Sequence, residues 1–63
     1  MYMVTVFIEE NDLKRSRMLL LLSKSEEEAR EMALSEIKKS GQVFVAFEKV
    51  CLLFQTASLL TTN

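Results

Sequence analysis

The chain contains no histidine, no proline and no tryptophan, and it has one glycine and one cysteine among its 63 residues. Without histidine it lacks the ligands of a His/Cys zinc site and the base of a Ser-His or Cys-His catalytic pair. A single glycine cannot build a glycine-rich phosphate-binding loop, and a single cysteine excludes a disulfide within the chain. We therefore expect no enzymatic activity, no metal site and no cofactor.

The chain also lacks a charge excess and long apolar runs. Eight basic against nine acidic residues give a net charge of −1, whereas nucleic-acid binders usually carry a strong basic excess. No unbroken apolar run exceeds five residues, and a membrane helix needs about 20. No basic segment precedes the first apolar stretch, so we expect no secretory signal and a cytoplasmic location. At this length residues 1–63 form one small domain.

Residues 2–9, YMVTVFIE, are rich in β-branched and aromatic residues and alternate like a strand. Asn11 and Asp12 tolerate left-handed backbone angles, so they predict the tip of a hairpin, and residues 15–22 form the returning strand. A turn centred there sets these pairs opposite one another: Ile8 and Arg15, Val6 and Arg17, Val4 and Leu19, Tyr2 and Leu21. The other face then carries Met3, Thr5, Phe7, Ser16, Met18, Leu20 and Leu22.

A helix is predicted from about Glu26 to Ser40. Ser25 followed by Glu28 is a capping-box pattern, in which the hydroxyl accepts from a backbone N–H and the carboxylate bonds back to the cap. Acidic residues occupy the first turn and lysines occupy the last turn. These charges are favourable there, because the helix dipole is positive at its N-terminus and negative at its C-terminus. Gly41 is placed to end the helix.

A third strand is predicted from Gln42 to about Phe54, followed by a frayed tail over residues 55–63. Val43, Val45 and Phe47 alternate with Phe44, Ala46 and Glu48, and Glu48-Lys49 is a candidate position for a bend or a bulge. Residues 50–60 also fit one face of a second helix. We favour the strand, because valine, cysteine and phenylalanine are poor helix formers.

The order of elements predicts an α+β fold of ββαβ type. A right-handed crossover places the third strand beside the first, which gives a three-stranded, mainly antiparallel sheet of order 2-1-3 with one helix on one face. One helix covers one face, yet both faces are apolar, so we expect an oligomer, with a homodimer as the first choice. Its predicted interface residues are Met3, Phe7, Phe44, Phe47 and Phe54. The alternative to an oligomer is that residues 50–60 fold back as a helix and cover the second face of the sheet within one chain.

Lys14, Arg15, Arg17 and Lys24 form the local basic cluster, and Lys14, Arg15 and Arg17 are the candidate partner-binding residues. On an exposed hairpin they can contact carboxylates or phosphates. Replacing both arginines with alanine should cost little stability, within about 1 kcal/mol. The aromatic residues are not interleaved with this cluster, so the sequence does not indicate a base-stacking platform.

The layout resembles that of small accessory proteins encoded by bacteriophages, some anti-CRISPR proteins among them. The shared features are a strand at residues 2–9, a returning strand, a serine-led acidic helix start at residues 25–29 and an apolar strand from Gln42. The resemblance implies a non-enzymatic inhibitor that binds and blocks a bacterial host or defence component. The alternatives are a weak nucleic-acid-binding accessory protein that uses the basic hairpin, and a structural subunit of a larger assembly.

Overall fold

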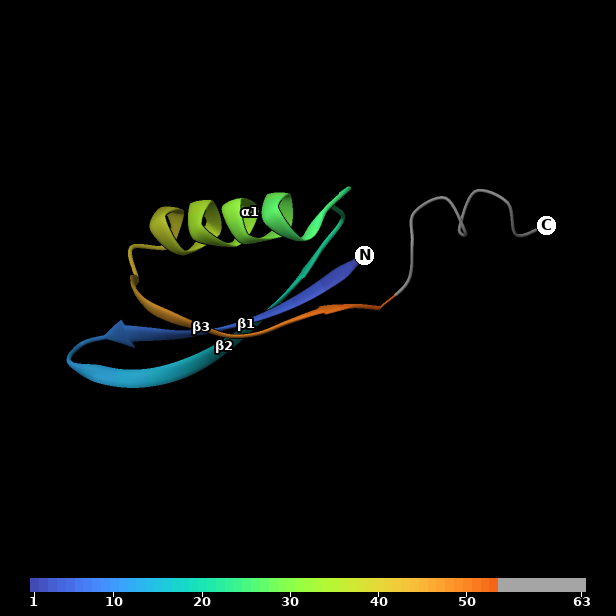
Figure 1. The fold of residues 1–63 in the computed structure, drawn as a ribbon. Helices are drawn as coiled ribbons and strands as arrows, with labels where there is room; N and C mark the ends of the chain where they lie inside the picture. The colour runs from blue at the N-terminus through green and yellow to red at the C-terminus, as the bar shows by residue number, and fades with distance from the viewer. Residues whose placement is uncertain (54–63) are drawn as a thin grey trace.

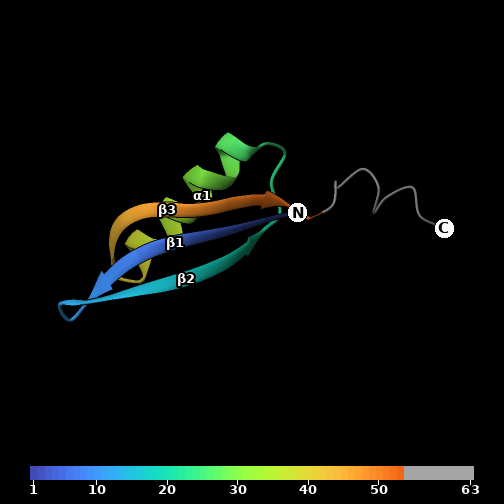
Figure 2. The same ribbon diagram turned by 60° about the horizontal axis from the view of Figure 1, so that its bottom comes forward.

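The computed structural model describes residues 1–53. It contains β1 (Tyr2–Glu10), β2 (Leu13–Leu21), α1 (Glu26–Lys39) and β3 (Val43–Leu52). The strands form one sheet in the order β2-β1-β3, and both neighbouring pairs are antiparallel. The helix lies along one face of this sheet (Figure 1), and the view in Figure 2 shows the three strands side by side with β1 in the centre. The predicted α+β fold of ββαβ type is confirmed.

The β1–β2 hairpin closes with a two-residue turn. Asn11 and Asp12 have φ angles of 54° and 64°, and two consecutive positive φ values define a type I′ turn, whose twist matches that of the flanking strands. Both strands extend further towards the turn than predicted, to Glu10 and Leu13. All four predicted cross-strand pairs are present, because the position of the turn sets the register of the hairpin.

Replacing Asp12 with glycine should raise the free energy of unfolding by about 0.5 kcal/mol. Glycine removes the left-handed strain of an L-residue, which exceeds the entropy that glycine adds to the unfolded chain. Urea unfolding followed by circular dichroism measures the change, with Asp12→Ala, which keeps the strain, as the control. A glycine variant less stable than the alanine variant would contradict the turn assignment.

The helix begins at a cap formed by two serines. The Ser25 hydroxyl accepts from the backbone N–H of Glu28 at 3.1 Å, as predicted. The second bond of the predicted capping box is different: the backbone N–H of Ser25 donates to Ser23 Oγ at 3.3 Å, and the Ser23 hydroxyl donates to the Ser25 carbonyl at 2.7 Å. Ser23 is buried, so its hydroxyl takes the place that the Glu28 carboxylate was expected to occupy.

Replacing Ser25 with alanine should lower the free energy of unfolding by about 1 kcal/mol, because the N–H of Glu28 loses its partner. The matched control is Ser35→Ala in the exposed middle of α1, which should leave stability unchanged or slightly raised. Thermal unfolding of both variants gives the comparison. Equal midpoints would show that the start of α1 does not depend on this cap.

The helix ends in a Schellman motif. Gly41 has a φ of 74°, its N–H donates to the Lys38 carbonyl at 3.1 Å, and the N–H of Gln42 donates to the Ile37 carbonyl at 3.2 Å. These bonds satisfy two carbonyls that would otherwise lack partners at the helix end. Glycine suits this position because it adopts a positive φ without steric cost.

The core lies between α1 and the sheet face that carries the even-numbered residues of β1. The helix contributes two small residues and one large one, and the small ones let its backbone approach the sheet closely. The core consists of Val4, Val6, Ile8, Leu19, Leu21, Ala29, Ala33 and Ile37. The sequence had left open which face of the sheet the helix covers.

Strand β3 departs from the alternation expected from the sequence. Its pairing with β1 shifts between Thr5 and Val6 and again between Phe7 and Ile8, so Val45 and Glu48 are extra residues in two β-bulges. The bulge at Glu48 agrees with the irregularity predicted at Glu48-Lys49, whereas the bulge at Val45 was not predicted. Phe44 and Phe47 therefore both face the helix and pack against the core, with ring centroids 4.9 Å apart. The prediction that they lie on opposite faces is wrong, because a bulge changes which residues share a face.

The end of β3 agrees with the strand prediction as far as the structure describes it. The strand continues through Val50 to Leu52, and the N–H of Leu53 donates to the Met1 carbonyl at 2.9 Å. Phe54, the tail 55–63 and most of the alternative helix over residues 50–60 lie outside the described residues.

Candidate interaction surfaces

The sheet face turned away from α1, here called the open face, is built from cross-strand rows. Residues directly opposite each other on neighbouring strands share a face. Running from the start of β1 towards the hairpin, and naming β2, β1 and β3 in turn, the rows are Leu20–Met3–Cys51, Met18–Thr5–Lys49, Ser16–Phe7–Ala46 and Lys14–Glu9–Val43.

Apolar side chains dominate the first three rows and remain accessible. Leu20 and Met18 are each more than 60% exposed, and Phe7 is 39% exposed. Leu22, directly after β2, is exposed as well. Cys51 is a half-buried free thiol. Three strands about 4.8 Å apart and nine residues long at about 3.3 Å per residue give the face a footprint of roughly 14 by 30 Å, or about 400 Å².

Polar groups on this face gather towards the hairpin and the two edge strands. Glu9 and Lys14 face each other in the row nearest the turn. The Ser16 hydroxyl donates to Glu48 Oε1 at 3.2 Å, which brings the bulged Glu48 side chain over the open face near Phe7. Charged residues therefore occur from the second row onwards, and the first row, at the start of β1, is apolar on all three strands.

The five predicted interface residues do not all lie on the open face. Met3 and Phe7 lie on the open face, whereas Phe44 and Phe47 face the helix and Phe54 lies outside the described residues. The Phe47 ring also lies under the Arg30 guanidinium, 5.7 Å from the ring centroid.

The list of predicted interface residues missed the most exposed members of the open face. Met18 and Leu20 stand opposite Thr5 and Met3, and the predicted hairpin register already put them on this face. The signal for them is the run of apolar residues that ends β2.

The three candidate partner-binding residues of the basic cluster also lie in different surroundings. Lys14 and Arg15 are exposed near the hairpin tip, where Glu9, Glu10 and Asp12 lie beside them. Two cations among three carboxylates do not make a basic patch. The tip of the hairpin therefore offers mixed charge rather than a phosphate-binding surface.

Arg17 is held within the fold. Its Nη1 donates to Ser40 Oγ at 3.0 Å and to Gln42 Oε1 at 2.8 Å. Gln42 Nε2 in turn donates to Glu10 Oε2 at 3.3 Å. This chain of bonds ties the hairpin to the segment that joins α1 to β3.

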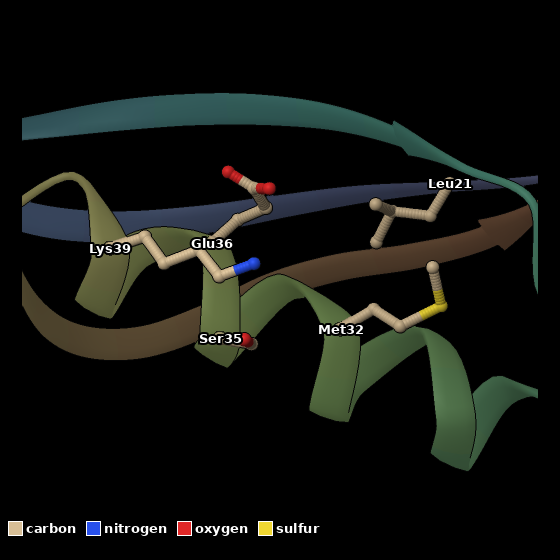
Figure 3. Close-up of a pocket in the computed structure, with 5 residues that line it drawn as sticks. All are labelled: Leu21, Met32, Ser35, Glu36 and Lys39. Carbon is tan, nitrogen blue, oxygen red and sulfur yellow. The ribbon is translucent and has the colours of Figure 1, made fainter.

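A groove of about 180 Å³ lies between α1 and β2. Figure 3 shows Leu21 and Met32 at one end of it and the charged ends of Glu36 and Lys39 at the other. Its volume is below the range of about 300–1,000 Å³ that small-molecule sites occupy. Within residues 1–53 no group of three or more His, Cys, Asp or Glu side chains is placed to hold a metal ion.

Comparisons with protein-family models, with curated proteins and with solved structures found no match. In the part of the chain that the structure describes, no helix is long and apolar enough to cross a membrane.

Proposed function

We propose that this chain is a small non-enzymatic protein–protein interaction module whose binding surface is the open face of its sheet. The observation that carries the proposal is the set of exposed apolar rows on the face that α1 does not cover. Contiguous exposed apolar patches of a few hundred Å² are often functional. At about 25 cal/mol per Å², each 100 Å² of apolar surface covered on this face is worth roughly 2.5 kcal/mol before the costs of association.

The resemblance to phage accessory proteins supports a bacterial host or defence protein as the target and the bacterial cytoplasm as the location. In this hypothesis the module inhibits by occupying a surface of its target. The exposed hairpin tip, with Lys14 and Arg15 among carboxylates, suits a protein surface of mixed charge better than a nucleic acid.

The proposal can be tested with two matched leucines of β2. Leu20 lies on the open face and is 61% exposed, whereas Leu13 lies beside the turn, opposite Glu10, and is 58% exposed. Tagged wild type, Leu20→Lys and Leu13→Lys are each mixed with a bacterial lysate that also contains the untagged wild-type chain. Wild type and Leu13→Lys should capture the same protein, either the untagged chain or a lysate protein, and Leu20→Lys should lose it.

The two substitutions add the same charge at equally exposed positions, so a general effect of lysine would appear in both. Circular dichroism establishes that both variants are folded. Capture that is equal for all three proteins would overturn the open face as the binding surface.

A further inference from the structure

We propose that the open face is covered by a second copy of this chain, with the two sheets packed face to face in a symmetric dimer. This inference rests on the proposed function, because it names the occupant of the same surface. The experiments distinguish failure of the dimer from failure of the proposed function.

The size of the face favours a second copy. Two copies bring two footprints of about 400 Å² into contact, roughly 800 Å² in total, which is the size of a small interface. Residues 54–63 follow Leu53 at the apolar end of the sheet. Even as one continuous helix, ten residues would be about 15 Å long and cover less than half of the face. A second sheet has the same dimensions as the first and covers it fully.

The arrangement of charge along the strands selects the orientation of the two copies. A twofold axis parallel to the strands keeps each row at its own level, so the apolar row of Met3 lies over the same row of the partner. An axis across the strands would instead bring Lys14 and Glu9 towards that apolar row, and burying charges against apolar groups is costly. We therefore infer that the strands of the two copies run in the same direction.

The same axis reverses the order of strands across the interface, so β2 of one copy faces β3 of the other. Leu20 then lies over Cys51 of the partner, and Met18 lies over Lys49 of the partner. Lysine tolerates this position, because its methylene stem covers apolar surface while its ammonium group reaches solvent at the sheet edge. Both edge strands contribute to the interface, and the central strand β1 packs on its own copy. At the hairpin end of the face the Glu9 side chains of the two copies then approach each other, each beside Lys14 of its own chain.

The first test measures association of the purified full chain. Sedimentation from low micromolar to several hundred micromolar concentration should report twice the 7.3 kDa of the chain. Leu20→Lys should weaken association about 30-fold or more, as expected when a charge replaces an apolar side chain that the interface buries. Leu13→Lys, outside the interface, should change it by less than about threefold.

Cys51 supplies a reporter that needs no substitution, because it is the single thiol of the chain. Its alkylation rate should fall about tenfold as the protein concentration rises through the dimer range, since the proposal places it under Leu20 of the partner. In Leu20→Lys the rate should not depend on concentration. Labelling in urea gives the rate for the unprotected thiol.

The orientation is tested with introduced thiols in a Cys51→Ser background. Met3→Cys should cross-link to its own copy with a short bis-maleimide, because an axis along β1 brings the two positions together. Ser16→Cys, on the same face but on the edge strand β2, should not. Cross-linking of the Ser16 variant but not the Met3 variant would overturn the orientation.

A chain that remains monomeric at every concentration would overturn the dimer. Protection of Cys51 that does not depend on protein concentration would also overturn it, because residues 54–63 of the same chain would then cover the face. Equal loss of association in Leu13→Lys and Leu20→Lys would also contradict it. A monomer whose Leu20→Lys variant still loses capture of a lysate protein would overturn the dimer and leave the proposed function intact.

Discussion

Replacing Ile37 with alanine should lower the free energy of unfolding by about 3 kcal/mol, because it removes a fully buried side chain and leaves a cavity. Ile37 is 1% exposed and is the large side chain among the three that α1 buries. A domain of this size has a total stability of roughly 3–5 kcal/mol. The variant should therefore be largely unfolded at physiological temperature.

Circular dichroism during a thermal scan measures this effect, and the control lies on the same helix. Leu34 is 39% exposed, so Leu34→Ala removes a side chain of similar size that is not in the core. It should cost less than about 1 kcal/mol, since alanine is also the better helix former. Similar midpoints for the two variants would mean that α1 does not hold the sheet through Ile37.

Replacing Arg17 with alanine should lower the free energy of unfolding by about 2 kcal/mol, and Arg15→Ala should change it by less than about 0.5 kcal/mol. The two arginines lie two positions apart on the same face of β2, but their surroundings differ. Arg17 donates to Ser40 and Gln42, whereas Arg15 is exposed near the turn. Losing Arg17 leaves these acceptors without a charged donor and releases the link between the hairpin and the end of α1.

Urea unfolding of the two single variants and the double variant measures these effects. The double variant should match Arg17→Ala, which revises the sequence-based expectation that both arginines can be replaced at little cost. Arg17→Lys keeps the charge but not the planar group that reaches two acceptors, so it should recover only part of the stability. An Arg15→Ala variant as unstable as Arg17→Ala would contradict this division.

The hairpin and the helix could be predicted from the sequence because local chemistry specifies both. Asn11 and Asp12 adopt left-handed angles in a turn of two residues, and that turn sets every pair between β1 and β2. Ser25 and Gly41 mark the ends of α1 through short-range hydrogen bonds. Each of these signals acts within a few residues, so no information on distant contacts is needed.

The candidate surface was only partly predictable. The hairpin register placed Met3, Phe7, Met18 and Leu20 on one face, but it did not show which face α1 would cover. Arg17 appeared free in the sequence, because its acceptors lie 23 and 25 residues away in the chain. Contacts over such separations exist only once the crossover has brought the end of α1 beside β2.

The sequence by itself determined the elements, their order and the register of the hairpin, because turn and cap residues act locally and apolar alternation identifies strands. Only the tertiary structure decided which side of the sheet each side chain of the third strand faces. The bulge at Val45 in β3 puts Phe44 and Phe47 on the same side of the sheet, because one extra residue between them shifts the alternation of side chains. The open face is consequently made by Met3, Phe7, Met18 and Leu20 rather than by the aromatic residues of β3.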